Sequence, residues 1–95
     1  MPTEHLPVAA TAASGADITV GAEGVVTFFL STAAGGHIPF GANVYVELKT
    51  SDGQYMIQDE LNSSKMSCTL HAEPGTIVRA RRLAGGPPVG VQRGA

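Results

Sequence analysis

The clearest alternation of apolar and polar positions in this chain lies in residues 43–61, NVYVELKTSDGQYMIQDEL. Two runs rich in valine, tyrosine, leucine and isoleucine flank Asp52 and Gly53, a pair typical of two-residue type I′ turns. The pattern therefore predicts a β-hairpin in which the numbers of paired residues sum to about 105.

This register gives the predicted hairpin one mainly apolar face and one mainly polar face, as expected for a sheet with one side on a core. Val44 is expected to face Leu61. Nearer the turn, Leu48 is expected to face Ile57. Asp59 falls opposite a valine on the apolar face, so we expect a bulge or an early end to the pairing there.

Further apolar runs, bounded by glycine, proline or polar turns, predict strands within residues 16–20, 25–32, 65–72, 76–83 and 89–93. Run 25–32 is apolar on both faces, so it reads as a central strand covered on each side or as a strand with one side buried in an oligomer contact. Run 89–93 reads as an edge strand. Runs 65–72 and 76–83 are expected to pair across a Pro-Gly turn. Together with the hairpin they predict an all-β fold: a single antiparallel β-sandwich of about seven short strands, either immunoglobulin-like or a minimal jelly roll.

The two segments without periodicity have different predicted roles. Residues 1–15 contain two prolines and many small residues, so we expect a flexible, extended N-terminal arm, followed by the sandwich domain over 16–95. Residues 33–42 form a glycine-rich connection that carries Ile38 and Phe40. These two side chains are expected either to plug the open end of the sandwich or to form an exposed contact.

Composition sets the scale of the core and the class of protein. With 95 residues, 43% of them apolar and none tryptophan, the chain is expected to form one domain with a modest core. Association with other copies or with a larger surface commonly stabilises such small cores. The single cysteine, Cys68, excludes an intramolecular disulfide, and no secretory signal or membrane-length apolar run is present. These features predict a soluble protein of a reducing compartment.

Charge is divided unevenly along the sequence. All eight acidic residues precede Pro74 and outnumber two lysines there, which leaves residues 1–73 with a net charge of −6. Four arginines give residues 74–95 a net charge of +4. Either the two parts neutralise each other within one sandwich, or a basic strand meets an acidic surface on another copy or another partner.

No group of side chains predicts a catalytic, metal or cofactor site. The three histidines lack ligand spacing, and Cys68 lies on the predicted inward face, where a thiol is inert. Asp59 and Glu60 are adjacent, so on a strand they point to opposite faces and cannot act as a pair. The glycine pairs lack the Lys-Ser/Thr of a phosphate loop. The sequence therefore predicts a protein that is not an enzyme.

Arg79, Arg81 and Arg82 form the one basic cluster of the sequence. The first two share a face of their predicted strand and could bind carboxylates or phosphates. An acidic chain with few aromatic residues argues against nucleic-acid binding. We therefore expect these arginines to form salt bridges within the fold or between subunits.

Several segments together resemble the small β-rich virion proteins of tailed bacteriophages, in particular capsid decoration or cement proteins. They are the Ala/Gly-rich leader, VVTFFLST, the hairpin sequence above, EPGTIVRARR, and the Gly-Pro-Pro break before VGVQRG. The resemblance implies a non-enzymatic structural protein that stabilises joints between capsid subunits. It also implies a virion location after assembly in the host cytoplasm, the major capsid protein or another virion protein as partner, and a dimer or trimer.

The residues expected at the contact surfaces are Leu6 and Val8 of the arm, Ile38 and Phe40 of the loop, and Arg79, Arg81 and Arg82. An alternative role is a small β-sandwich binding module, such as a tail-fibre or carbohydrate- or receptor-binding domain. In that role Tyr45 and Tyr55 would supply the aromatic platform that sugar sites usually present.

Overall fold

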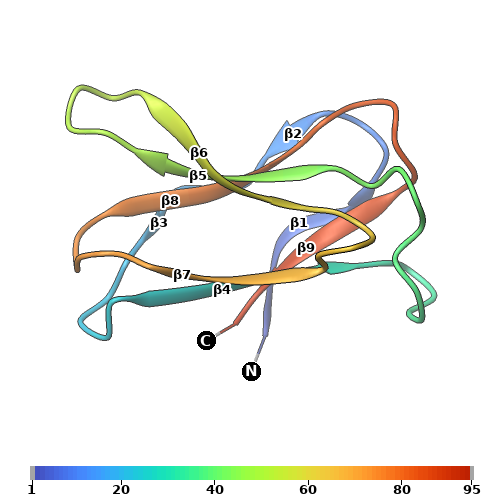
Figure 1. Cartoon of the computed structure of the whole chain (residues 1–95), viewed down its shortest axis with the longest axis horizontal. Coiled ribbons are helices and arrows are strands. Elements are labelled where there is room, and N and C mark those ends of the chain that lie inside the picture. The colour runs from blue at the N-terminus through green and yellow to red at the C-terminus, as the bar shows by residue number, and fades with distance from the viewer. Residues whose placement is uncertain (1, 95) are drawn as a thin grey trace.

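The computed structural model describes residues 2–94, and Met1 and Ala95 lie outside the described residues. The described chain forms two antiparallel sheets packed face to face, with short connections at both ends (Figure 1). The strands are β1 (Thr3–Ala9), β2 (Ala13–Ser14), β3 (Ile18–Thr19), β4 (Val25–Ser31), β5 (Val44–Lys49), β6 (Tyr55–Leu61), β7 (Ser67–His71), β8 (Ile77–Arg82) and β9 (Val89–Arg93).

The strands pair in a nested order. β1 pairs with β9, β2 and β3 pair with β8, β4 pairs with β7, and β5 pairs with β6. The first sheet has the order β1-β9-β4-β7, and the second has β2-β8-β5-β6 with β3 also on β8. This wrapped order is that of a jelly roll, one of the two predicted topologies. It differs from the immunoglobulin order because β9 joins the opposite sheet from β8.

The core lies between the sheets and is built by alternation along each strand. In β4 the buried positions are every second residue, with Phe28 at the centre, and β8 alternates in the same way. The largest fully buried side chains are Phe28, Leu61, Val20, Val44, Val46, Val78, Val89 and Val91. Valine therefore supplies most of the burial.

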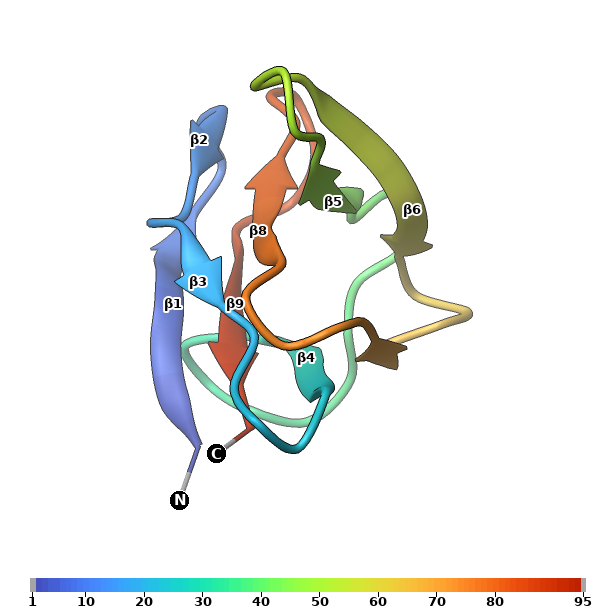
Figure 2. The same cartoon turned by 90° about the vertical axis from the view of Figure 1, so that its left-hand side faces the viewer.

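The predicted flexible arm is wrong, because most of residues 2–15 belong to the sheets. β1 pairs along β9, and β2 pairs with β8. Leu6 is only 3% exposed and belongs to the core. Figure 2 shows β1, β2 and β3 together along one side of the sandwich, with β6 on the other. β1 and β2, which both lie within residues 2–15, are the two strands beyond the seven that were predicted.

The turn between β5 and β6 has three loop residues, 51–53, instead of the predicted two. Gly53 has a left-handed backbone with φ of 88°, whereas Asp52 does not have the positive φ that a type I′ turn requires. The Gly53 N–H donates to the Thr50 carbonyl (3.1 Å), and the Thr50 N–H donates to the Gln54 carbonyl (2.7 Å). This is a type I turn followed by a left-handed glycine.

The longer turn shifts the register near the loop by one residue. Leu48 faces Met56, which is one position from its predicted partner. Gln58 is an extra residue of a β-bulge next to Asp59, so the bulge predicted in this region is confirmed. Beyond the bulge the predicted pairing of Val44 with Leu61 is also confirmed. The bulge thus compensates for the extra turn residue.

Two other predicted neighbours are wrong. β7 does not pair with β8; it pairs with β4 in the first sheet, and the connection between β7 and β8 passes from one sheet to the other. β9 is not an edge strand, because β1 covers the side of β9 that β4 leaves free. The second error follows from β1, whose pairing with β9 places the last strand inside the first sheet.

Arg82 is buried between the sheets where the chain passes from β1 to β2, so its predicted role at an interface is wrong. It is 3% exposed. Its Nε donates to the carbonyl of Thr11 (2.6 Å), and its Nη1 donates to the carbonyls of Pro7 (2.7 Å) and Val89 (2.9 Å). Hydrogen bonds of this kind offset the cost of burying a charge. Arg82 therefore connects β8, β9 and the N-terminal segment.

His5 makes a second connection across the sandwich. The register shift after Glu4 marks a bulge that redirects the imidazole, whose Nε2 accepts the Ala80 N–H of β8 at 3.0 Å. A Cβ at Gly15 would lie 2.1 Å from that nitrogen, so the site requires glycine. Burial, followed by the charge of Arg93, holds the pKa of His5 below its ordinary value of 6.5.

We expect stability to fall as the pH drops below about 6.5, because the unfolded chain then binds a proton at His5 that the folded chain takes up only at lower pH. The measurement is the urea midpoint as a function of pH. His5→Gln should flatten the profile in this range, since an amide oxygen can still accept the Ala80 N–H but does not titrate. His71→Gln, at an exposed histidine, is the control. An unchanged profile in the His5 variant would contradict this account.

Candidate functional site

The outer face of the second sheet carries a carboxylate bound by two arginines. Glu47 on β5 accepts hydrogen bonds from Nε of Arg79 and Nε of Arg81, one at each carboxylate oxygen and each at 3.0 Å. Both arginines lie on β8, directly beside β5. Glu47 is 3% exposed although it points away from the core, since the arginine side chains cover it. The two guanidinium groups are therefore fixed relative to each other.

Two tyrosine rings support the arginines. The guanidinium carbon of Arg79 lies 3.5 Å from the centroid of the Tyr55 ring, and that of Arg81 lies 5.4 Å from the centroid of the Tyr45 ring. The Tyr55 hydroxyl donates to Asp17 at 2.5 Å, and this hydrogen bond is the main reason that the pKa of Tyr55 is raised. We call this surface the arginine face: Asp17, Tyr45, Glu47, Lys49, Tyr55, Arg79 and Arg81.

Most charges on the arginine face are paired within the chain. Besides the pairs with Glu47, Lys49 lies 3.8 Å from Asp17. The acidic first part of the sequence and its basic last part thus partly neutralise each other within the sandwich, through the pairs of Glu47 with Arg79 and Arg81. This agrees with the first of the two interpretations of the uneven charge. The named set has three cations and two carboxylates, and Glu60, which pairs with Tyr45 across β5 and β6, places a third carboxylate on the same side of the sheet. Within residues 2–94, the terminal nitrogens of Arg79 and Arg81 form no hydrogen bond.

The residues predicted at the contact surfaces lie in different environments. Arg79 and Arg81 are together on the arginine face, whereas Leu6 is in the core and Val8 is half-buried in β1. The other two predicted residues, those of the loop, also differ from each other: Ile38 packs against the core, and Phe40 is 93% exposed. Glu47 was not among the predicted site residues, because in the hairpin pattern it is one of several polar positions on the outer face. The sequence signal for Glu47 was its negative charge, which is opposite to that of the alternating Arg79 and Arg81.

Phe40 lies at the end of the sandwich formed by the β4–β5 connection and the β6–β7 turn, on the right in Figure 1. A hollow of about 320 Å³ adjoins it, lined by Phe40, Gly41, Ala42, Asn43, Glu60, Asn62, Ser63 and Ser64. Met66, which is 49% exposed, follows this turn. The end therefore combines an exposed aromatic ring with a hollow.

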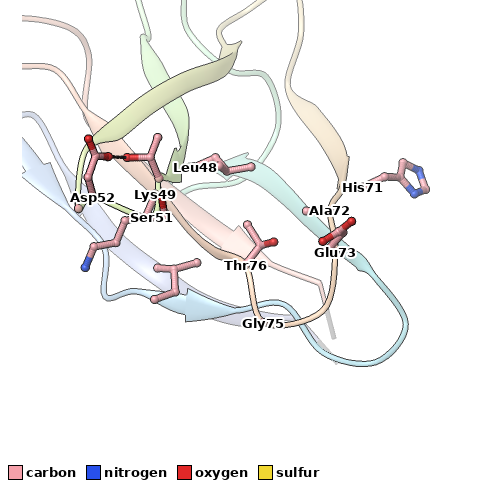
Figure 3. A pocket seen from close by; sticks show the side chains of 12 residues that line it. Leu48, Lys49, Ser51, Asp52, His71, Ala72, Glu73, Gly75 and Thr76 are labelled. Carbon is pink, nitrogen blue, oxygen red and sulfur yellow. Dashed lines mark hydrogen bonds between the residues drawn. The ribbon is translucent and has the colours of Figure 1, made fainter.

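A larger groove of about 950 Å³ lies at the opposite end, between the β5–β6 turn and the β7–β8 turn (Figure 3). Leu48 and Ile77 contribute apolar surface to it, and the Thr50 hydroxyl donates to the carboxylate of Asp52 on its rim. His71 points away from the space between the turns (Figure 3). Among the described residues that line the groove, His71 is directed away from the carboxylate of Asp52, so the two do not form an acid–base pair.

Cys68 is buried, and burial raises the pKa of its thiol, so it is unreactive. Residues 2–94 contain no group of three or more His, Cys, Asp or Glu side chains placed to hold a metal ion.

No helix in residues 2–94 is long and apolar enough to span a membrane.

The sequence matches no known protein family, and no curated protein matches it. Among solved structures, the chain is similar to the crystal structure of SPBc2 prophage-derived protein YomS. The similarity has a TM-score of 0.67 and 9% sequence identity, and it covers 98% of this chain and 88% of that chain. At this identity the likeness shows a shared fold alone.

Replacing both arginines that bind Glu47 should lower the free energy of unfolding by more than the sum of the two single changes. Arg79→Gln or Arg81→Gln leaves one cation on the carboxylate, whereas the double variant leaves a covered charge unpaired and should lose about 3 kcal/mol. Urea unfolding of the singles, the double and the triple variant with Glu47→Gln measures this coupling. The triple variant should recover part of the loss. Lys65→Gln, which removes an exposed pair with Asp59, should change the urea midpoint far less than the double variant does. Small, additive losses would contradict this account.

Proposed function

We propose that this chain is a non-enzymatic structural protein of a bacteriophage particle, a decoration or cement protein that binds the assembled shell and stabilises joints between capsid subunits. Its partner would be the major capsid protein or another virion protein, and its location the virion after assembly in the host cytoplasm. The prophage origin of the similar structure and the resemblance of the sequence to virion proteins support this setting.

The observation that carries the proposal is the pair of arginines fixed by Glu47 on the arginine face. Both use Nε for Glu47, so their terminal nitrogens remain free to bind carboxylates. Because Glu47 and the tyrosine rings already order the side chains, binding loses little side-chain entropy. Two fixed guanidinium groups with free terminal nitrogens suit carboxylates on a neighbouring shell protein.

The same geometry disfavours the alternative role as a sugar-binding module. Tyr45 and Tyr55 do lie on one face, as that alternative requires, but Arg79 occupies one side of the Tyr55 ring at 3.5 Å. A sugar platform needs an aromatic face free for stacking. We therefore prefer binding of a protein surface through the arginines.

Particles of the source phage that lack this chain provide the test. Purified chain is added back, and co-sedimentation with the particles is measured at several salt concentrations. Arg81→Gln should weaken binding about tenfold, the size expected for one hydrogen bond between charged groups. Binding of the unmodified chain should weaken with salt. Arg93→Gln, on the first sheet, is the matched control and should bind normally.

Two results would contradict the proposal. One is a phage whose complete particles lack the chain by mass spectrometry. The other is a chain that binds particles equally well with and without Arg81. In the Arg81→Gln variant Glu47 keeps its hydrogen bond from Arg79, so the chain should remain folded. The urea midpoint checks this and separates a loss of binding from a loss of folding.

A further inference from the structure

Residues 2–15 lie at the outer edge of both sheets, on one side of the sandwich (Figure 2). In the first sheet β1 pairs with β9, and in the second sheet β2 pairs with β8. β9 also pairs with β4, and β8 also pairs with β3 and β5. Each remaining strand therefore keeps a partner without β1 and β2, so this segment can leave the sheets while the other pairs stay intact.

The backbone pairing of this segment is irregular, so side chains contribute much of its attachment. Register shifts interrupt the pairing of β1 with β9 after Glu4 and after Leu6. Pro7 has no N–H to donate, and β2 contains only two residues. The attachment therefore depends on the burial of Leu6, on the hydrogen bonds of Arg82 and on the contact of His5 with β8.

The imidazole of His5 makes a tight contact that suits its neutral form. Its Nε2 accepts the N–H of Ala80 at 3.0 Å, and the centroid of the Phe28 ring lies 5.3 Å from that of the imidazole. A Cβ at Gly15 would lie 2.1 Å from the same nitrogen, so the backbone of Gly15 packs directly against the ring. Protonation makes Nε2 a donor that faces the Ala80 N–H, which then loses its acceptor. The charged form of His5 therefore disfavours the closed arrangement.

The charges around His5 also oppose its protonation. β9 contributes Arg93, and β8 contributes Arg82, whose guanidinium binds the same segment. β4 and the chain after β2 contribute the uncharged Phe28 ring and backbone, and on β1 the exposed Glu4 precedes His5. Within residues 2–94, no carboxylate forms an ion pair with His5. Because burial, followed by Arg93, holds the pKa of His5 below its ordinary value of 6.5, a falling pH favours the released imidazole, which binds a proton first.

We propose that residues 2–15 form a pH-sensitive switch: protonation of His5 releases this segment from both sheets, while β3 to β9 stay folded. At neutral pH the segment stays in the sheets. Release ends before Asp17, because the Tyr55 hydroxyl donates to that carboxylate and Ile18 is buried in the core. Release uncovers the edge of β9 that β1 covers in the closed form. The switch is a property of the isolated chain, so it can fail without affecting the proposed binding of a shell.

The test is residue-resolved amide hydrogen exchange of the full chain between about pH 7.5 and about pH 5, with each rate corrected for the intrinsic rate at that pH. Below about pH 6.5, the protection of amides in residues 3–15 should fall several-fold per pH unit, and about tenfold is the limit for one proton. The Ala80 amide should lose protection in parallel, because it loses its acceptor. Amides of β4, β5 and β6 should keep their protection.

His5→Gln should make the protection of this segment independent of pH, since an amide oxygen can accept the Ala80 N–H without titrating. His71→Gln, at an exposed histidine, is the matched control and should behave as the unmodified chain. A double variant, Glu4→Cys with Gln92→Cys, tests release without altering His5, because these positions pair across β1 and β9. The oxidised double variant should keep the segment protected at low pH, and its reduced form should release it.

Three results would overturn the proposal. The first is protection of residues 3–15 that does not change with pH in the unmodified chain. The second is a loss of protection that is equally large in β4 and β5, because the whole chain then unfolds together. The third is an unchanged pH dependence in His5→Gln or in the oxidised double variant.

Discussion

The buried guanidinium of Arg82 is the interaction on which the arrangement of this fold depends. It binds carbonyl groups of β1, of the corner after β1 and of β9, and thereby fixes the N-terminal segment to strands from the end of the chain. His5 strengthens the same connection by accepting the backbone N–H of Ala80 in the other sheet. With β1 in place, β9 becomes an interior strand and the nested order of the jelly roll is complete. One polar side chain in a valine-rich core thus connects both sheets.

This constraint determines which parts of the molecule remain available to partners. A leader held in the sheets cannot act as a flexible arm that orders on binding, so Leu6 contributes to the chain's own stability. Available surface then lies on the arginine face and at the end with Phe40. The first is rigid and charged because Glu47 fixes two arginines. The second combines one exposed aromatic ring with a hollow lined mostly by polar side chains.

The sequence predicted most strands and the fold class, because alternation and turn residues are local signals. It failed where a distant residue decided the outcome. The leader has no alternation of its own, and its pairing depends on the last strand and on Arg82. The predicted hairpin register was wrong by one residue near the turn, because Asp-Gly is compatible with both a two-residue and a three-residue loop. The hydrogen bonds between the backbones of Thr50, Gly53 and Gln54 define the three-residue loop. The arginines at 79 and 81 were recognised from their spacing, but the carboxylate that fixes them was visible only once β5 and β8 were neighbours.

The central claim is that the leader is part of the folded sandwich, so that contacts with partners are made by surfaces of the sandwich itself. Residue-resolved amide hydrogen exchange of the full chain tests this most directly. The account predicts that amides of β1 that pair with β9 are protected to a degree similar to those of β9, in the absence of any partner. Exchange of residues 3–9 at the rate of an unstructured peptide, while β4 and β8 stay protected, would contradict it and restore the flexible arm as the binding element.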